Sequence, residues 1–230
     1  MKATIYHIAH DLDLQGHPDR DRILNARQTW ETLRRIDKAW QPVWFNTTGR
    51  RTSRDLSDTR SVPYINDLFN LGVEVAGGDG IVCWTNLDVC VVPETAVVIR
   101  QKLAVAPCCR SARINVDDAR QRRSWSDLAS EGVAPGTDLF TFRPSWWLKH
   151  RDTFPDMFIA CEAFDTILRW LMEQDNPGAE ICPPLLYHQR HEAFWVQPEN
   201  RLHNPAQRHN RRMASEWCDS RGWNNPFKSG

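Results

Sequence analysis

The sequence predicts an α/β sandwich with a mainly parallel central sheet. Two observations support this fold class. Segments with the apolar pattern of strands alternate with segments of helical periodicity along most of the chain, as in proteins built from strand–helix–strand units. The length of 230 residues suits one such domain and falls short of two full-size domains. We therefore expect a single domain over residues 1–230.

The first half of the chain supplies three strands and three helices. Ile23, Ala26, Trp30 and Leu33 repeat at three-to-four spacing and predict an amphipathic helix. A later helix is expected to begin at Pro63, which suits a first helical position, and to end at Gly77. The predicted strands cover residues 3–10, 41–46 and 81–92, and the predicted helices cover residues 19–39, 63–76 and 93–103.

Two longer polar stretches interrupt this alternation. Residues 46–62 are rich in Thr, Ser, Arg and Asp, and a polar loop of this length in a compact domain indicates a binding loop or disorder. Residues 115–136 form a second polar insertion. The other predicted elements are a strand over 104–110, a strand that enters a turn over 138–150, and a helix from about Glu162 onward.

Charge and cysteine content argue against several classes of protein. Basic and acidic residues balance at 29 each, so no overall field draws the chain to nucleic acid or to an acidic membrane. Arginine clusters at 50–51, 120–123 and 208–212 could still contact phosphates, although solvated turns contain such runs as well. Seven cysteines without a CxxC pair argue against a disulfide framework and a four-thiolate zinc site.

The sequence contains no pattern of a membrane span or a secretory signal. No stretch approaches the roughly 18–20 apolar residues that a transmembrane helix needs. The N-terminal stretch "MKATIYHIAHD" reaches a charged residue at Asp11 and lacks a small-residue cleavage site. We therefore expect a soluble, cytoplasmic protein.

A polar pair interrupts the apolar stretch "IVCWTNLDVCVVPE" at residues 81–94. Burying an unpaired carboxylate is costly, so Asp88 needs a partner or a solvent-facing position. Ligands of α/β sheets bind beyond the carboxyl ends of the strands, and we expect Asn86 and Asp88 to lie there. The pair suits a hard divalent cation with its phosphates, or ribose hydroxyls. A plain turn or capping role is the alternative.

The order of several short motifs resembles a known family. These motifs are "RSVPYINDLF", "TNLDV", "GTDLFTFRPSWW", "PDMFIACEAFDTILRWLM" and "YHQRHEAFW". Together they resemble the GT-A fold, the Rossmann-like α/β/α sandwich of nucleotide-sugar transferases, in the form seen in many uncharacterised glycosyltransferase-like proteins. The resemblance spans roughly residues 3–212. Its specificity comes from the order of the motifs, because each motif alone is short.

The resemblance implies a glycosyltransferase that moves a hexose or pentose from a nucleoside-diphosphate sugar to a hydroxyl acceptor. The acceptor could be a glycan, a small molecule or a modified nucleic-acid base. The donor would bind the half formed by about residues 1–105, and the acceptor the half formed by about 106–212. Residues 213–230 would form a C-terminal tail.

The resemblance also implies Mn²⁺ or Mg²⁺ as a cofactor. The family motif has a carboxylate where this chain has Asn86, so Asp88 is the expected metal ligand. A histidine near the end of this fold can complete the metal shell, which makes His188 the first candidate and His191 the second. The implied donor contacts are His10, Arg51, Arg54, Asp67, Asn86 and Asp88.

Three carboxylates are candidates for chemistry at the acceptor. Asp138 follows a Gly-Thr turn, and Glu162 and Asp165 lie three residues apart at a predicted helix start, where they share one helical face. Inverting transfer to a hydroxyl needs a carboxylate that takes the proton. A strand-start role for Asp138 and a helix-dipole role for the other two are the alternatives.

Two other functional classes stay open on the sequence alone. A non-catalytic nucleotide-binding or sugar-binding relative would share the fold, and Asn86 keeps that option open. A nucleic-acid-modifying or nucleic-acid-binding protein would use the arginine clusters and the tryptophans on phosphates and bases.

Overall fold

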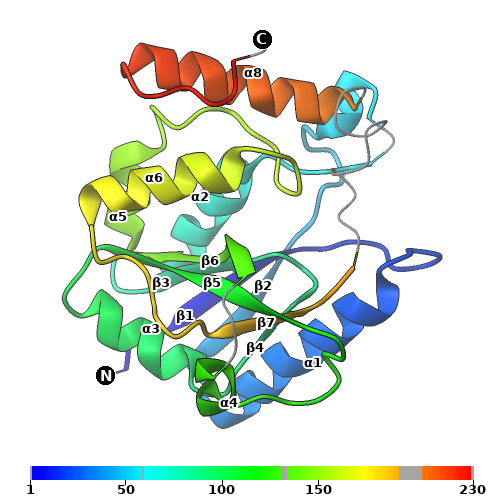
Figure 1. The fold of residues 1–230 in the computed structure, drawn as a ribbon, viewed down its shortest axis with the longest axis vertical. Helices are drawn as coiled ribbons and strands as arrows, with labels where there is room; N and C mark the ends of the chain where they lie inside the picture. The colour runs from blue at the N-terminus through cyan, green and yellow to red at the C-terminus, as the bar shows by residue number, and fades with distance from the viewer. Residues whose placement is uncertain (1, 59, 131–133, 192–203, 229–230) are drawn as a thin grey trace.

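The computed structural model describes residues 2–58, 60–130, 134–191 and 204–228, and Figure 1 shows how its elements are arranged. The elements are β1 (Ile5–His10), α1 (Arg20–Ile36), β2 (Trp40–Phe45), the 3₁₀-helix η1 (Ser53–Leu56), α2 (Ile65–Ala76), β3 (Ile81–Thr85), β4 (Val89–Val91), α3 (Thr95–Leu103), β5 (Cys108–Val116), α4 (Trp125–Ala129), β6 (Ala134–Phe142), α5 (Pro144–His150), α6 (Phe164–Asp175), β7 (Leu186–Gln189) and α8 (Pro205–Ser220).

The strands form one seven-stranded sheet in the order β2-β1-β3-β6-β5-β7-β4. β1 pairs in parallel with β2 and β3, and β5 pairs in parallel with β7. β6 lies between β3 and β5 and is antiparallel to both, and β4 is antiparallel to β7. Five of the seven strands therefore run in one direction, which confirms the predicted α/β class with a mainly parallel sheet.

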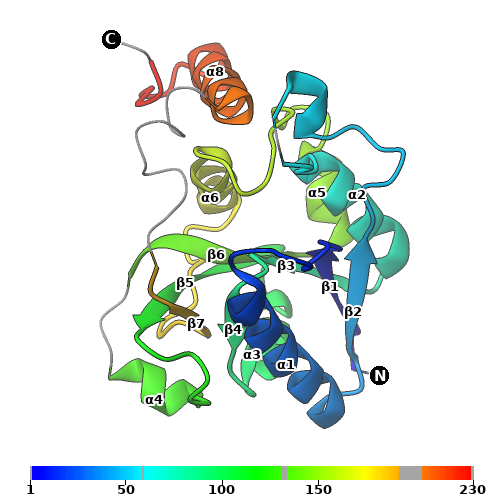
Figure 2. The same ribbon diagram turned by 90° about the vertical axis from the view of Figure 1, so that its right-hand side faces the viewer.

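Helices cover both faces of the sheet, as Figures 1 and 2 show. α2, α5 and α6 lie on one face with α8 outside α6, and α1 and α3 lie on the other. Side chains alternate accordingly, so that Ile8 and Trp84 belong to the core under α2 and α6, whereas Ile5 and Cys83 belong to the opposite core. Burial on both faces explains the nearly continuous apolar runs of the strands.

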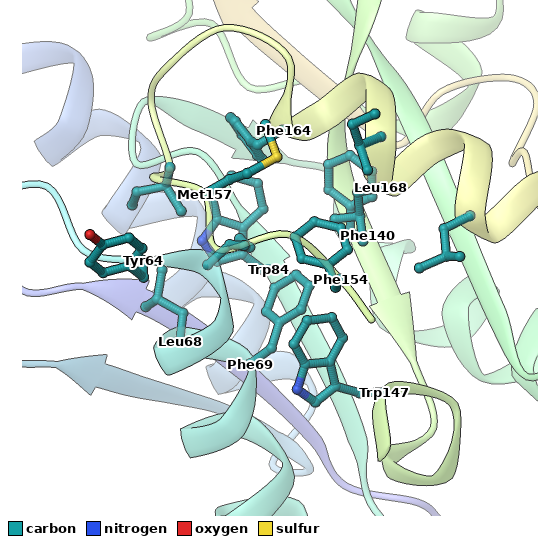
Figure 3. Packing of buried hydrophobic residues seen from close by; sticks show 14 of the residues in the cluster. Tyr64, Leu68, Phe69, Trp84, Phe140, Trp147, Phe154, Met157, Phe164 and Leu168 are labelled. Carbon is teal, nitrogen blue, oxygen red and sulfur yellow. The ribbon is translucent and has the colours of Figure 1, made fainter. Parts of the chain in front are cut away.

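The core under α2 and α6 is rich in aromatic rings (Figure 3). The ring centroids of Phe69 and Trp147 lie 5.0 Å apart, with the ring planes at 86°. Trp84 of β3 meets Phe164 of α6 in the same edge-to-face manner, at 5.6 Å and 83°. Such pairs add about 0.5–1.5 kcal/mol each beyond area burial. The second pair ties the start of α6 to the carboxyl end of β3.

α2 begins two residues later than predicted. Pro63 forms a β-bridge with Thr52, and Tyr64 is the N-cap residue, so the first helical residue is Ile65. The predicted end is confirmed, since Gly77 follows the helix with a φ of 60°, a left-handed value that glycine adopts without strain.

The second half of the chain departs further from the sequence-based prediction. The strand expected over 104–110 is β5 at Cys108–Val116, because α3 and the turn after it occupy the preceding residues. The expected insertion over 115–136 contains α4 and the start of β6. α5, β7 and α8 were not predicted, and α8 extends into the residues expected to form a C-terminal tail. Within the described residues, no helix combines the length and apolarity of a membrane span.

His7 of β1 is a buried titratable group that makes stability depend on pH. Its ring packs against Trp30 and Trp40 at centroid distances of 4.5 and 5.0 Å, and its Nε2 lies 2.9 Å from the Thr85 hydroxyl. Burial lowers the pKa of His7 to about 3. Between that value and the unfolded pKa of about 6.5, the unfolded chain binds a proton that the folded chain does not.

The free energy of unfolding should therefore fall as the pH drops below about 6.5, by about 1.4 kcal/mol per pH unit from His7 alone. The change His7→Gln should reduce this slope. Urea unfolding at about pH 7.5, 6 and 5 measures it. An identical slope in both proteins would assign the pH dependence to other groups.

Candidate active site

A cleft of about 1540 Å³ opens at the edge of the sheet where β1, β2 and β3 end and β6 begins. This is the edge where α/β sheets bind their ligands. The cleft is lined by nine of the residues predicted for the site, namely His10, Arg54, Asn86, Asp88, Asp138, Glu162, Asp165, His188 and His191.

Asp88, His188 and His191 bring three potential metal ligands together. Asp88 Oδ2 lies 3.0 Å from His188 Nε2 and 3.2 Å from His191 Nε2, and the two nitrogens lie 3.0 Å apart. Strand register explains this meeting, because β4 is antiparallel to β7 and pairs Val89 with His188. Asp88 lies one residue before β4, and His191 lies two residues after β7.

The geometry of this Asp–His–His triad fits a divalent cation. Two ligands at right angles around an ion, with bonds of about 2.1 Å, lie about 3.0 Å apart. The separations in the triad are 3.0, 3.0 and 3.2 Å. One carboxylate with two imidazoles suits a first-row transition cation such as Mn²⁺ better than Mg²⁺, which prefers oxygen ligands alone.

Asp88 is ionised in this arrangement. Burial acts to raise its pKa, but the hydrogen bonds with His188 and His191 outweigh burial and lower the pKa. His188 Nδ1 is buried and meets no hydrogen-bond partner in the described part of the chain, so the Nε2 side carries the polar contacts of this ring. The triad thus presents a carboxylate and two ring nitrogens toward one point.

Asn86 orients Asp138 and does not join the triad. Its Nδ2 donates to Asp138 Oδ1 at 2.5 Å, and Arg113 of β5 donates to Asp138 Oδ2. The Asp138 carboxylate is buried, and these two donors satisfy both of its oxygens. A carboxylate at position 86 would repel it, which accounts for an amide here. Arg113 was not predicted as a site residue, because only the pairing of β5 with β6 brings it to the cleft.

Removing Arg113 should destabilise the protein. The change Arg113→Met leaves the buried Asp138 carboxylate with Asn86 alone, and we expect a loss of about 1–3 kcal/mol in the free energy of unfolding. Arg120→Met is the control, because its ion pair with Asp118 is exposed and should contribute little. Urea unfolding at neutral pH compares the two variants. Equal stabilities would contradict the importance of the buried pair.

Asp165 and Glu162 line the same cleft in different electrostatic states. Burial raises the pKa of Asp165 in the first turn of α6, and the charge of Asp138 adds to this effect. Glu162 instead pairs with Arg211 of α8 at 3.2 Å. Among the described residues, Asp165 forms no ion pair. The charge of Arg169 acts to lower the pKa of Asp165 but does not outweigh burial. A carboxylate with a raised pKa and no ion pair is better suited to accept a proton than a paired one.

Arg51 and Asp67, predicted as donor contacts, are not among the residues that line the cleft. The Arg51 guanidinium bonds to Asp156 at 3.0 Å and stacks on the Tyr64 ring at 4.4 Å. Burial raises the pKa of Asp67, and the charge of Arg51 opposes that rise. Arg54 does line the cleft, and it forms no ion pair with the described residues. It is therefore free to meet an anion.

Several hydrogen bonds fix the backbone around η1 in the polar loop that follows β2. Thr52 and Asp55 form a capping box around η1, in which each side chain accepts a hydrogen bond from the backbone amide of the other. The Ser53 hydroxyl is buried and donates to the Arg60 carbonyl at 2.8 Å. These contacts fix the position from which Arg54 faces the cleft.

His10 lines the cleft as a neutral ring. Burial lowers its pKa to about 4, while the nearby charges of Asp11 and Arg27 act in opposite directions. The ring can therefore donate or accept a hydrogen bond without adding charge.

The fold is that of an α/β protein, and a cleft lined by charged and polar side chains lies at the carboxyl edge of its sheet. No protein-family model matches the chain, and no curated protein matches it. Among solved structures, TarS of S. aureus in complex with UDP-GlcNAc is similar over 94% of this chain and 71% of its own, with 11% identity and a TM-score of 0.43.

A second solved structure is the galactosyltransferase LgtC in complex with donor and acceptor sugar analogues. It is similar over 94% of this chain and 95% of its own, with 10% identity and a TM-score of 0.32. Both neighbours are GT-A-type glycosyltransferases, the class that the sequence resembles. Likenesses with TM-scores this low carry no argument about activity, which depends on the residues of the cleft.

Proposed function

We propose that this protein is a glycosyltransferase that moves a sugar from a nucleoside-diphosphate sugar to a hydroxyl acceptor. One observation carries the proposal, namely that a single cleft combines the triad of Asp88, His188 and His191 with Asp165, a carboxylate of raised pKa that forms no ion pair with the described residues. Transfer of this kind needs charge stabilisation on the leaving diphosphate and a base for the acceptor hydroxyl, and the cleft offers a candidate for each.

Asp88, His188 and His191 would hold a divalent cation, preferably Mn²⁺, at the donor side of the cleft. Bound there, the cation would act as a Lewis acid that offsets the charge developing on the diphosphate. Arg54 would contact the same phosphates from η1, and its planar guanidinium suits a bidentate contact with phosphate oxygens. His10 would contact the nucleoside or a sugar hydroxyl as a neutral group.

Asp165 would take the proton of the acceptor hydroxyl. Asp138 would accept hydrogen bonds from sugar hydroxyls, held in place by Asn86 and Arg113. Glu162 would shape the acceptor wall, because its carboxylate is already engaged by Arg211.

A thermal-shift screen tests the donor assignment. Nucleoside diphosphates and sugar nucleotides are added with and without Mn²⁺, and a ligand at 100 times its dissociation constant should stabilise the fold by about 2.7 kcal/mol. We expect stabilisation by at least one nucleoside diphosphate that depends on Mn²⁺. If every nucleotide leaves the melting temperature unchanged in both conditions, the donor assignment is wrong.

The change Arg54→Met should weaken nucleoside-diphosphate binding by about 10-fold or more, since charge-assisted hydrogen bonds contribute about 1.5–3 kcal/mol. Arg51→Met is the matched control, because the Arg51 guanidinium bonds to Asp156 outside the cleft. Titration calorimetry measures both affinities. Equal losses in the two variants would argue against a specific phosphate contact by Arg54.

The described structure does not favour a nucleic-acid-binding function. Two of the arginine clusters are engaged within the protein, since Arg120 pairs with Asp118 and Arg211 pairs with Glu162. Among the described residues, no arginine of these two clusters lines the cleft. We therefore propose no second function.

A further inference from the structure

The segment that leads into α6 has a strained backbone where it lines the cleft. Ala160 and Ala163 have φ angles of 50° and 79°, in the left-handed region that a Cβ atom makes unfavourable. Both residues belong to the cleft wall, and Asp165 follows two residues after the second. Strain of this kind persists only where surrounding contacts hold the backbone in place.

α8, more than forty residues later in the chain, supplies such contacts. Asn210 Oδ1 accepts a hydrogen bond from the Phe158 amide at 2.8 Å. Asn210 Nδ2 donates to the carbonyls of Phe158 and Glu162 at 2.9 and 3.1 Å. Gln207 Oε1 accepts from the Glu162 amide at 2.6 Å. Positions 207 and 210 lie on one face of α8, so both amides bind the same segment.

The side-chain amides of Gln207 and Asn210 form their described hydrogen bonds with this segment. Gln207 and Asn210 are both 0% exposed, and a fully buried amide is costly unless its hydrogen bonds are made. Asn210 uses both its oxygen and its nitrogen, and Gln207 uses its oxygen, whereas Gln207 Nε2 meets no partner among the described residues. Their described hydrogen bonds go to the backbone of residues 158–162. α8 also contacts α6, which follows this segment in the chain, and η1 (Figure 2).

We propose that Gln207 and Asn210 are positioning residues that hold residues 158–163 in the conformation that presents Asp165 to the cleft. Without them, Ala160 and Ala163 would relax toward ordinary backbone angles, and the start of α6 would shift. Where it concerns transfer, this inference rests on the proposed function. The hold on the backbone is a property of the fold and can be measured without a substrate.

Hydrogen exchange on the full chain tests directly whether Gln207 and Asn210 fix the backbone of residues 158–163. In Asn210→Ala, the Phe158 amide loses its acceptor, and its exchange should accelerate by about 10-fold or more, together with that of Glu162. Gln207→Met is a milder variant. Because Gln207 Nε2 meets no partner among the described residues, this change removes one described hydrogen bond, the one to Glu162, and keeps the volume.

Trp217→Phe is the matched control on the same helix. It removes the hydrogen bond from Trp217 Nε1 to the Thr153 carbonyl, at 2.9 Å, and leaves residues 158–163 untouched. In Asn210→Ala and Gln207→Met, kcat for transfer should fall by about 10–100-fold, because a small displacement of Asp165 slows proton transfer. Donor affinity should stay within about 2-fold of the parent value. The control should keep both values near those of the parent.

A rescue variant separates positioning from general destabilisation. Glycine adopts a φ of 79° without strain, so Ala163→Gly added to Asn210→Ala should recover part of the lost kcat, by about 3-fold or more. A role in stability alone predicts no recovery, because glycine makes the unfolded chain more flexible.

The outcomes are distinguishable. If the exchange of the Phe158 and Glu162 amides is unchanged in both Asn210→Ala and Gln207→Met, the two side chains do not fix this backbone. If exchange is faster but kcat equals that of the parent, they do not position Asp165. A parent chain that binds donors but transfers no sugar would overturn the proposed function and the catalytic role with it, while the exchange result decides the hold separately.

Discussion

Asp165→Asn should lower kcat for sugar transfer by about 10²–10⁴-fold, the range of general-base effects, and leave donor affinity nearly unchanged. The amide keeps the size of the side chain but cannot take the proton of the acceptor hydroxyl. In the parent, kcat should rise with pH through the pKa of Asp165, which burial places above the usual aspartate value. Nucleoside-diphosphate release, followed across pH with a hydroxyl acceptor, measures both effects.

The same substitution should stabilise the fold at neutral pH. A raised pKa means that the folded protein disfavours the ionised carboxylate. Ionisation of Asp165 therefore lowers the free energy of unfolding of the parent above the folded pKa, and has no such effect below the unfolded pKa of about 3.9. The stability gained by Asp165→Asn should therefore shrink as the pH falls toward about 4. Lower activity with higher stability is the combination expected of a functional carboxylate, and a purely structural one would not show it.

Glu162→Gln is the matched control for Asp165→Asn. Its carboxylate pairs with Arg211, so it is not available as a base, and we expect less than about a 10-fold loss of kcat. Full activity of Asp165→Asn would remove Asp165 from the mechanism and leave Asp138 as the remaining candidate. A larger loss in Glu162→Gln than in Asp165→Asn would exchange the roles of the two carboxylates.

Asp88→Asn should abolish the Mn²⁺-dependent part of donor binding. The carboxylate is the single anionic ligand of the triad, and the neutral amide that replaces it is a weaker ligand for a divalent cation. In the thermal-shift assay, the parent should gain about 2.7 kcal/mol from a nucleoside diphosphate at 100 times its dissociation constant with Mn²⁺. In the variant, the stabilisation by the nucleoside diphosphate should be the same with and without Mn²⁺.

His188→Gln should behave in the same way, because it removes a nitrogen ligand and leaves the carboxylate in place. Asp165→Asn serves as the opposite control, since it should retain Mn²⁺-dependent donor binding and lose turnover. Parent-like Mn²⁺ dependence in both Asp88→Asn and His188→Gln would show that the triad does not hold the cation.

The sequence predicted the parts of the fold that have strong local patterns. β1, α1 and β2 were expected close to their observed positions, because the period of apolar residues is clear and each element is bounded by polar or glycine residues. The single strand expected over 81–92 is two strands, β3 and β4, and the turn between them carries Asn86 and Asp88. Asp88 was expected at a strand end for a physical reason, the cost of burying a charge, and the structure places it in the turn after β3, directly before β4. Short elements such as β7 carry too few residues for a pattern.

The site was harder to predict than the fold, because its contacts join distant segments. Arg113 meets Asp138 only through the pairing of β5 with β6, and Asn210 meets Phe158 only because α8 packs over α6. Arg51 looked like a phosphate ligand in the sequence, yet it bonds to Asp156, more than one hundred residues away. Composition shows which groups are available, and tertiary packing decides which of them remain free.

The most direct test of the central claim is donor turnover by the purified chain. Sugar nucleotides that stabilise the protein are incubated with Mn²⁺ and a panel of hydroxyl acceptors, and released nucleoside diphosphate is measured. The proposed function predicts release that increases with at least one acceptor and is lost in Asp165→Asn. A parent protein that binds a sugar nucleotide with Mn²⁺ and releases no nucleoside diphosphate with any acceptor would contradict it.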